Sequence, residues 1–204
     1  MLVLPLRALA MYNTTLPAFI PSTISGAIHP MPRNIEIKAR LTSLSDVESR
    51  TARLAQQGPR LILQEDFFFN IPQGRLKLRK FDAAHGELIY YEREDTLEPK
   101  ESFYLRSATA EPDALVETLT AALGLRGVVR KQRTLYLVGQ TRVHLDRVEN
   151  LGDFLELEVV LELDQTPEAG AQVAQALMHS LGIPPEALVR GAYIDLLEAQ
   201  AAHG

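Results

Sequence analysis

The chain has 204 residues, a formal net charge of -5 and no cysteine. This length suits one domain, or one domain with a tail, and such a domain can bury a core without disulfides or a structural metal. The lack of cysteine excludes disulfides and thiolate metal sites, so any bound metal would need carboxylate, imidazole or water ligands. The net negative charge argues against a non-specific nucleic-acid binder, which normally carries a basic excess.

The first thirty residues differ in composition from the rest. They contain one basic side chain, Arg7, no acidic side chain and four prolines. We predict that residues 1–30 are a disordered leader, or precede a working start at Met31, and that residues 31–204 form the domain. A signal peptide fits poorly and the prolines exclude a membrane span. We therefore expect a cytoplasmic protein that does not bind membranes.

The ordered pattern begins with a strand. Asn34, Glu36 and Lys38 share one parity and alternate with apolar Ile35 and Ile37, which is typical of a half-buried strand.

A helix is predicted next. Ser45 and Glu48 have the spacing of a capping box, and Gly58 takes the stop position after the run to Gln57.

Short alternating strands joined by turns follow. The segments "LIL" to "FFF", "RLKLRK", "ELIYYERED" and "SFYLRSA" predict two hairpins, the first turning through Pro72 to Gly74. A second helix is predicted from Pro112 to a stop at Gly124.

The second half repeats this organisation. Three strands are predicted in "VVRKQRTLYLV", "TRVHLDRVE" and "FLELEVVLEL", and a third helix runs from Thr166 and Pro167 to Gly182. Two short helices are predicted after it. With about eight strands and helices after the first, fifth and last, the fold class is α+β and dominated by antiparallel hairpins.

The polar face of almost every predicted strand carries formal charge. For any single strand this indicates only a solvated face, but together the positions are unusual, with bases in the middle strands and acids in the first and last. They are Glu36, Lys38, Lys77, Arg79, Tyr91, Arg93, Lys131, Arg133, Arg142, His144, Asp146, Glu156 and Glu158.

Closing such a sheet with its charged face inward would place basic residues opposite acidic ones, with helices on the apolar outside. Buried charge on this scale is costly unless it is paired or occupied by ions. The matching occupant is a polyanion with a divalent metal, because basic side chains hold phosphate oxygens and carboxylates hold Mg²⁺ or Mn²⁺.

These residues resemble the CYTH superfamily of triphosphate tunnel proteins, and the resemblance runs from about Arg33 to Leu197. It is carried by "NIEIK", "GRLKLR", "YYER", "RKQR" and "RVHLDRVENLGDFLELE". The family strand Glu-x-Glu-x-Lys is matched except at its first position, where this chain has Asn34. The branch most similar is that of the bacterial class IV adenylyl cyclases.

The resemblance implies a closed eight-stranded antiparallel β-barrel with helices packed outside, and a set of site residues. Asn34 in place of the motif acid leaves the number of metal ions open. The implied triphosphate-binding residues are Lys38, Lys77, Arg79, Arg93, Lys131, Arg133 and Arg142, of which Lys38, Arg79 and Lys131 are the predicted catalytic residues. The implied ligands of Mg²⁺ or Mn²⁺ are Glu36, Asp146, Glu156 and Glu158.

The implied function is a metal-dependent enzyme that acts on a triphosphate-bearing small molecule. The first candidate reaction converts ATP into cyclic AMP and pyrophosphate. The alternatives are an inorganic or organic triphosphatase of the same fold, acting on tripolyphosphate or thiamine triphosphate, and a non-catalytic binder of nucleotides or polyphosphate. No nucleic-acid partner is expected, and a homodimer is compatible with the sequence.

Overall fold

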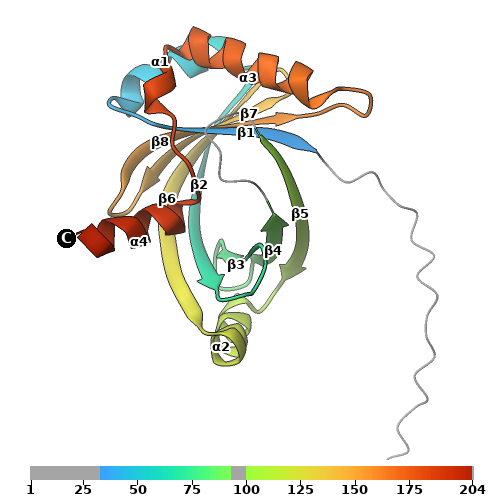
Figure 1. Cartoon of the computed structure of the whole chain (residues 1–204), viewed down its shortest axis with the longest axis vertical. Helices are drawn as coiled ribbons and strands as arrows, with labels where there is room; N and C mark the ends of the chain where they lie inside the picture. The colour runs from blue at the N-terminus through green and yellow to red at the C-terminus, as the bar shows by residue number, and fades with distance from the viewer. Residues whose placement is uncertain (1–32, 93–99, 204) are drawn as a thin grey trace, which may run out of the picture.

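The computed structural model describes residues 33–92 and 100–203, which form eight β-strands, four α-helices and one short 3₁₀ helix (Figure 1). The predicted leader lies outside these residues. The strands are β1 (Asn34–Arg40), β2 (Gln57–Phe69), β3 (Arg75–Lys80), β4 (Gly86–Glu92), β5 (Lys100–Thr109), β6 (Leu125–Val138), β7 (Thr141–Val148) and β8 (Gly152–Val160). The helices are α1 (Leu44–Leu54), α2 (Pro112–Leu123), α3 (Pro167–Leu181), η1 (Pro185–Ala187) and α4 (Tyr193–His203).

The strands follow one another in the order β1-β5-β4-β3-β2-β6-β7-β8, and every pair is antiparallel. The first strand, β1, pairs with β8 along its whole length but with β5 only from Asn34 to Glu36. Within the described chain, residues 57–64 of β2 pair with β6 alone. The antiparallel eight-stranded sheet of the predicted α+β fold is therefore confirmed, while full closure of the barrel stays a prediction.

The first helix differs from its prediction at both ends. Its N-cap is Ser43, whose side chain accepts a hydrogen bond from the Asp46 amide, so the predicted Ser45–Glu48 capping box is wrong. The Glu48 carboxylate instead accepts a hydrogen bond from the Tyr136 hydroxyl. The helix ends at Leu54, and Gly58 lies within β2 because strand pairing with β6 begins there and overrides the local stop signal.

The second and third predicted helices are confirmed together with their end signals. Helix α2 begins at Pro112 and ends before Gly124, which has a positive φ of 79°. Helix α3 has Thr166 as its N-cap and Gly182 as a left-handed C-cap. Proline at a first helical position and glycine after the last follow the usual asymmetry of helix ends.

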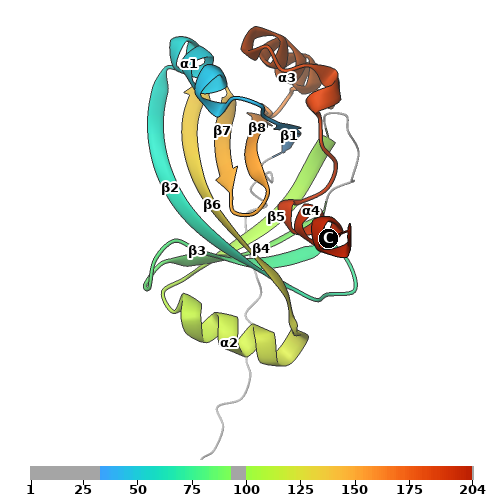
Figure 2. The same ribbon diagram turned by 90° about the vertical axis from the view of Figure 1, so that its left-hand side faces the viewer.

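The main core lies between the outer face of the sheet and the helices α1 and α3, which lie together on one side of it (Figure 2). Apolar residues of β1 and β8, such as Ile35, Leu155 and Leu157, are almost completely buried there. Because side chains alternate along a strand, burying this parity turns the charged parity to the opposite face of the sheet.

The C-terminal helix α4 packs against β6, away from α1 and α3 (Figure 1). Its first turn carries Tyr193 and Ile194, which join a second cluster of buried residues with Phe68, Val129 and Phe154. Asp195 accepts a hydrogen bond from the Ala192 amide and so caps the helix. None of the helices in the described residues combines the length and apolar character needed to cross a membrane.

Candidate active site

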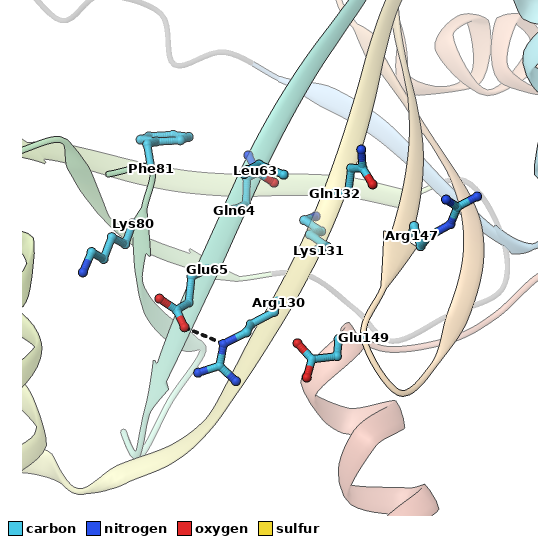
Figure 3. Close-up of a pocket in the computed structure, with 10 residues that line it drawn as sticks. All are labelled: Leu63, Gln64, Glu65, Lys80, Phe81, Arg130, Lys131, Gln132, Arg147 and Glu149. Atoms are coloured by element: carbon cyan, nitrogen blue, oxygen red, sulfur yellow. Dashed lines mark hydrogen bonds and ion pairs between the residues drawn. The ribbon is translucent and has the colours of Figure 1, made fainter. Parts of the chain in front are cut away.

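The charged parity lines one cavity of about 670 Å³, to which all eight strands contribute. The lining includes nine of the site residues predicted from the sequence, namely Glu36, Lys38, Lys77, Arg79, Lys131, Arg133, Arg142, Glu156 and Glu158. Another hollow of about 490 Å³ runs along the outer face of β2 and β6, where Glu65 and Arg130 form an ion pair (Figure 3). We place the candidate site in the larger cavity because it gathers the predicted residues.

On one wall of the cavity, two basic side chains donate hydrogen bonds to a single buried carboxylate. Asp146 on β7 is fully buried and lies opposite Arg133 of β6 in the strand register. Its Oδ1 accepts a hydrogen bond from Arg133 Nε at 2.6 Å, and its Oδ2 accepts from Arg133 Nη2 at 2.6 Å and from Lys131 Nζ at 3.0 Å. The two cations hold the pKa of Asp146 below its usual range despite burial.

The β2–β3 side of the cavity has a similar arrangement around Asp66. This residue is 2% exposed, lies opposite Arg79, and receives hydrogen bonds from Arg79 Nε at 2.7 Å and from Lys77 Nζ at 2.7 Å. Burial, with the nearby Arg79 and Lys131 charges, lowers the pKa of Lys77 to about 7 although Asp66 opposes the shift. Sequence inspection missed Asp66, although it shares the parity of Gln64 and Phe68 in β2.

The third group consists of acids on β1 and β8 with their cations. Glu158 lies opposite both Glu36 and Arg142 in the register, and Arg142 binds its two oxygens at 2.8 Å each. Glu156 accepts from Arg133 Nη2 at 3.1 Å and lies 3.9 Å from Lys38 Nζ. The structure therefore places acids of β8 beside cations of β1, β6 and β7.

The donor atoms of this third group bear on metal binding. In the chain as described, no three His, Asp or Glu side chains gather as a site that could hold a metal ion. However, Glu36 and Glu158 are opposite each other, and Oδ1 of fully buried Asn34 has no hydrogen-bond partner while its Nδ2 donates to Glu158 at 2.6 Å. An amide oxygen beside carboxylates suits a hard divalent ion, so these residues fit such a group.

Asp146 is the most buried of the four predicted metal ligands, since Glu36, Glu156 and Glu158 are each partly exposed. Both of its oxygens are used by Lys131 and Arg133, and the Tyr193 hydroxyl also donates to Oδ2 at 3.0 Å. These contacts assign Asp146 to balancing and orienting cations, and they give no support to its predicted role as a metal ligand.

Tyr193 enters the site from the C-terminal helix. Its ring lies 4.1 Å from Lys38 Nζ and 5.0 Å from Lys131 Nζ, within the range of cation–π attraction. Burial and the Asp146 and Glu156 charges raise the pKa of its phenol well above the usual value, so it remains a hydrogen-bond donor. No sequence signal indicated this role, because Tyr193 belongs to no charged strand.

His144 and Gln64 also face the cavity with unused hydrogen-bonding atoms. The described contacts leave His144 Nδ1 and Gln64 Oε1 buried and without a partner. Burial and the Arg133 charge hold the pKa of His144 well below its usual range, so its ring is neutral at pH 7. Buried polar atoms of this kind normally bind water or a ligand. The remaining predicted residue, Arg93, lies outside the described residues.

Comparison with known proteins agrees with this geometry. Residues 32–193, which are most of the chain, match the CYTH domain family.

The chain belongs to the CYTH family.

Two proteins are similar to this CYTH protein over most of their length. The adenylate cyclase CyaB of Aeromonas hydrophila is 28% identical to it over 180 residues, which are 80% of this chain and 88% of the relative. The structure of PH1012 from Pyrococcus horikoshii OT3 is 28% identical, with a TM-score of 0.72, and the match covers 80% of this chain and 98% of that one.

A third comparison carries information on the fold alone. HpAC1 from Hippeastrum, described as having a dominant triphosphatase activity, aligns with a TM-score of 0.55 and 20% identity over 78% of this chain and 91% of that one. The family prediction is thus confirmed, and the shared fold includes proteins described by two different activities.

Proposed function

We propose that this CYTH protein is a metal-dependent enzyme that acts on triphosphate-bearing small molecules, with the conversion of ATP into cyclic AMP and pyrophosphate as its first candidate reaction. The observation that carries the proposal is the pair of Asp–Lys–Arg clusters lining one cavity. Lys and Arg side chains held in fixed positions bind phosphate oxygens through charge-assisted hydrogen bonds. The proposal includes closure of the sheet into a tunnel, which the pairing of β1 with both β5 and β8 supports.

The charge of the cavity supports a role for divalent metal. The Lys and Arg side chains of the lining are nearly balanced by its carboxylates and the adjacent Asp146. The basic side chains are Lys38, Arg60, Lys77, Arg79, Arg106, Lys131, Arg133 and Arg142, and the acidic ones are Glu36, Asp66, Asp82, Glu87, Glu156 and Glu158. A triphosphate therefore needs further positive charge in order to be neutralised. We propose that Glu36, Glu156, Glu158 and the Asn34 amide hold Mg²⁺ or Mn²⁺, which would offset charge on the phosphate oxygens.

In the cyclase reaction, the ribose 3′-oxygen forms a bond to the α-phosphorus of ATP. The bond from that phosphorus to the oxygen bridging the α- and β-phosphates breaks, pyrophosphate leaves, and the hydroxyl proton passes to water. Lys38, Arg79 and Lys131 are proposed to contact the oxygens on which charge accumulates. Because these side chains are already held by buried carboxylates, they can act by positioning and electrostatic stabilisation.

The relative from Aeromonas favours the cyclase reaction, because it is described as an adenylate cyclase and aligns over most of both chains. Hydrolysis of the terminal phosphate by water requires the same charge stabilisation in the same cavity. A triphosphatase is therefore the second candidate, and the description of the Hippeastrum protein supports keeping it. A non-catalytic binder is the third, because Asn34 replaces an acidic motif residue.

The deciding experiment incubates the purified protein with ATP, thiamine triphosphate and tripolyphosphate in turn, with Mg²⁺ or Mn²⁺, and separates the products by chromatography. Cyclic AMP with pyrophosphate would support the cyclase proposal. Orthophosphate from any of the three would assign the protein to the triphosphatases. Tight binding without any product would leave only the non-catalytic binder.

A further inference from the structure

The buried acid Asp66 has a role that neither the sequence motifs nor the family match assigns. It lies on β2, which contributed no predicted site residue, and its side chain faces the cavity. Its Oδ2 accepts from Lys77 Nζ at 2.7 Å and from Arg79 Nη2 at 2.9 Å, while Oδ1 accepts from Arg79 Nε at 2.7 Å. One carboxylate thus orients two predicted phosphate-binding side chains.

The same geometry occurs a second time in the cavity. Asp66 is the register partner of Arg79, as Asp146 is of Arg133, and in both cases the lysine precedes the arginine by two residues. Residues two apart in a strand point to the same face, so an aspartate opposite the arginine can reach both cations. The cavity therefore has two equivalent clusters, each with two cations and one acid.

Stability does not account for these clusters. Taking several charges out of water costs much of what their attraction returns, and apolar residues of similar volume often serve a core as well or better. Lys77 Nζ also lies 5.4 Å from the Phe68 ring and 5.6 Å from the Tyr91 ring, so apolar neighbours are already present. A cluster of buried charges beside these aromatic rings therefore indicates a function in binding.

We propose that Asp66 is a positioning residue, which fixes Lys77 and Arg79 so that together they bind a phosphate group of the substrate opposite the Asp146 cluster. The identity of that substrate rests on the function proposed above. Each cluster has one positive charge in excess when its lysine is protonated. The two clusters thus form two anion subsites within the cavity.

The protonation of Lys77 provides a readout specific to this role. The groups that act on it are Asp66 from β2, Arg79 from its own strand and Lys131 from β6. Asp66 favours the protonated form, whereas burial and the two cations oppose it. Removal of the Asp66 charge therefore lowers the pKa of Lys77 below about 7 and shortens the pH range in which Lys77 binds anions.

The test measures tripolyphosphate binding by calorimetry, over a range of pH, in Asp66→Asn, with Glu65→Gln as the matched control. Glu65 is the next residue of β2 and pairs with Arg130 on the outer face. We expect the dissociation constant near neutral pH to rise about 10- to 100-fold in Asp66→Asn. As the pH is raised, this variant should begin to lose affinity at a lower pH than the parent does. Glu65→Gln should show no change. In a Lys77→Met background, Asp66→Asn should no longer move the pH profile.

A purely structural role predicts a different result. Folded Asp66→Asn would then bind tripolyphosphate as tightly as the parent, or more tightly, at every pH. Equal or tighter binding would overturn the proposal. If Asp66→Asn does not fold, Asp66→Glu decides, because it keeps the charge but displaces it: positioning predicts weaker binding with the pH profile retained, and parental binding would overturn it.

The result separates this proposal from the proposed enzymatic function. If the parent protein binds tripolyphosphate but converts no triphosphate, the enzyme proposal fails while the Asp66 effect is still measured. If the parent binds no tripolyphosphate at all, both are overturned. Turnover combined with unaltered binding in Asp66→Asn would retain the enzyme and reject the positioning role.

Discussion

At the scale of single residues, the site depends on which charges share a partner. Lys77 and Arg79 share Asp66, Lys131 and Arg133 share Asp146, and this sharing rather than mere proximity sets their protonation. Burial disfavours every one of these charges, and the shared carboxylate opposes that effect. The pKa values of Arg79 and Arg133 are raised, whereas those of Lys77 and Lys131 are lowered. The pKa of Lys77 is lowered to about 7, so this lysine titrates near neutral pH.

The first prediction concerns pH. The pKa of Lys77 is lowered to about 7, so the protonated fraction of Lys77, and with it its contribution to tripolyphosphate affinity, should decline as the pH rises through about 7. A Lys77→Arg variant keeps its charge and should lose this dependence. Calorimetry on both proteins at matched pH values checks this prediction. The ionisation of tripolyphosphate itself affects both proteins equally, so parallel pH profiles of affinity would contradict the prediction.

The second prediction concerns the motif position occupied by Asn34. Asn34→Glu would place a carboxylate beside Glu158, whose oxygen now accepts from the Asn34 amide at 2.6 Å. Two adjacent acids repel each other unless a cation lies between them, so the variant should be less thermostable than the parent without metal. It should gain more thermal stability on addition of Mn²⁺, and also more metal-dependent turnover. An equal Mn²⁺ shift in both proteins would show that this position does not limit metal binding.

At the scale of elements, packing against the outer face of the sheet fixes the strands that carry the site. Helix α3 crosses β1 at Gly170, which is completely enclosed by its neighbours. On β1 the apolar residue Ile35 faces this helix, and the next residue, Glu36, faces the cavity. The outer core therefore positions part of the acidic wall.

The third prediction tests that contact. A Cβ at Gly170 would overlap Leu161 Cδ2 and lie 2.8 Å from Ile35 Cγ1, closer than carbon atoms normally approach. Gly170→Ala should therefore reduce the free energy of unfolding by about 1 to 3 kcal/mol, measured by urea denaturation. Gln175→Ala, at an exposed position of the same helix, is the control and should have little effect. Equal stability of the two variants would contradict tight packing here.

At the scale of the whole molecule, the near balance of charge in the cavity makes polyanion binding dependent on added cations. The acidic and basic side chains already neutralise each other in pairs. A bound triphosphate would therefore add charge that the protein alone does not offset.

The fourth prediction follows from this balance. Removal of divalent cations with a chelator should abolish turnover and weaken tripolyphosphate binding, and Mg²⁺ or Mn²⁺ should restore both. Glu158→Gln should require about 10- to 100-fold more metal for half-maximal activity, because it loses one of the proposed ligands. Full activity in chelator-treated protein, measured by product chromatography, would exclude the metal requirement.

The amino-acid sequence by itself determined the strands, the ends of α2 and α3, and the parity that faces inward. These features are local, because alternation and helix caps involve residues close together in the chain. The family, too, was recognisable from short charged motifs. The stop signal at Gly58 failed because pairing of β2 with β6, a contact between distant segments, begins at Gln57, and α1 ends at Leu54.

Only the tertiary structure decided which charges share partners. Asp66 on β2 accepts a hydrogen bond from Lys77 on the neighbouring strand β3. Tyr193, which is 47 residues further along the chain than Asp146, donates to it from helix α4. Neither contact leaves a local pattern, because each depends on how separate elements pack and not on spacing along one of them. The sequence therefore named the cations and four of the acids of the site, and the fold added Asp66 and Tyr193 and showed which cations each acid binds.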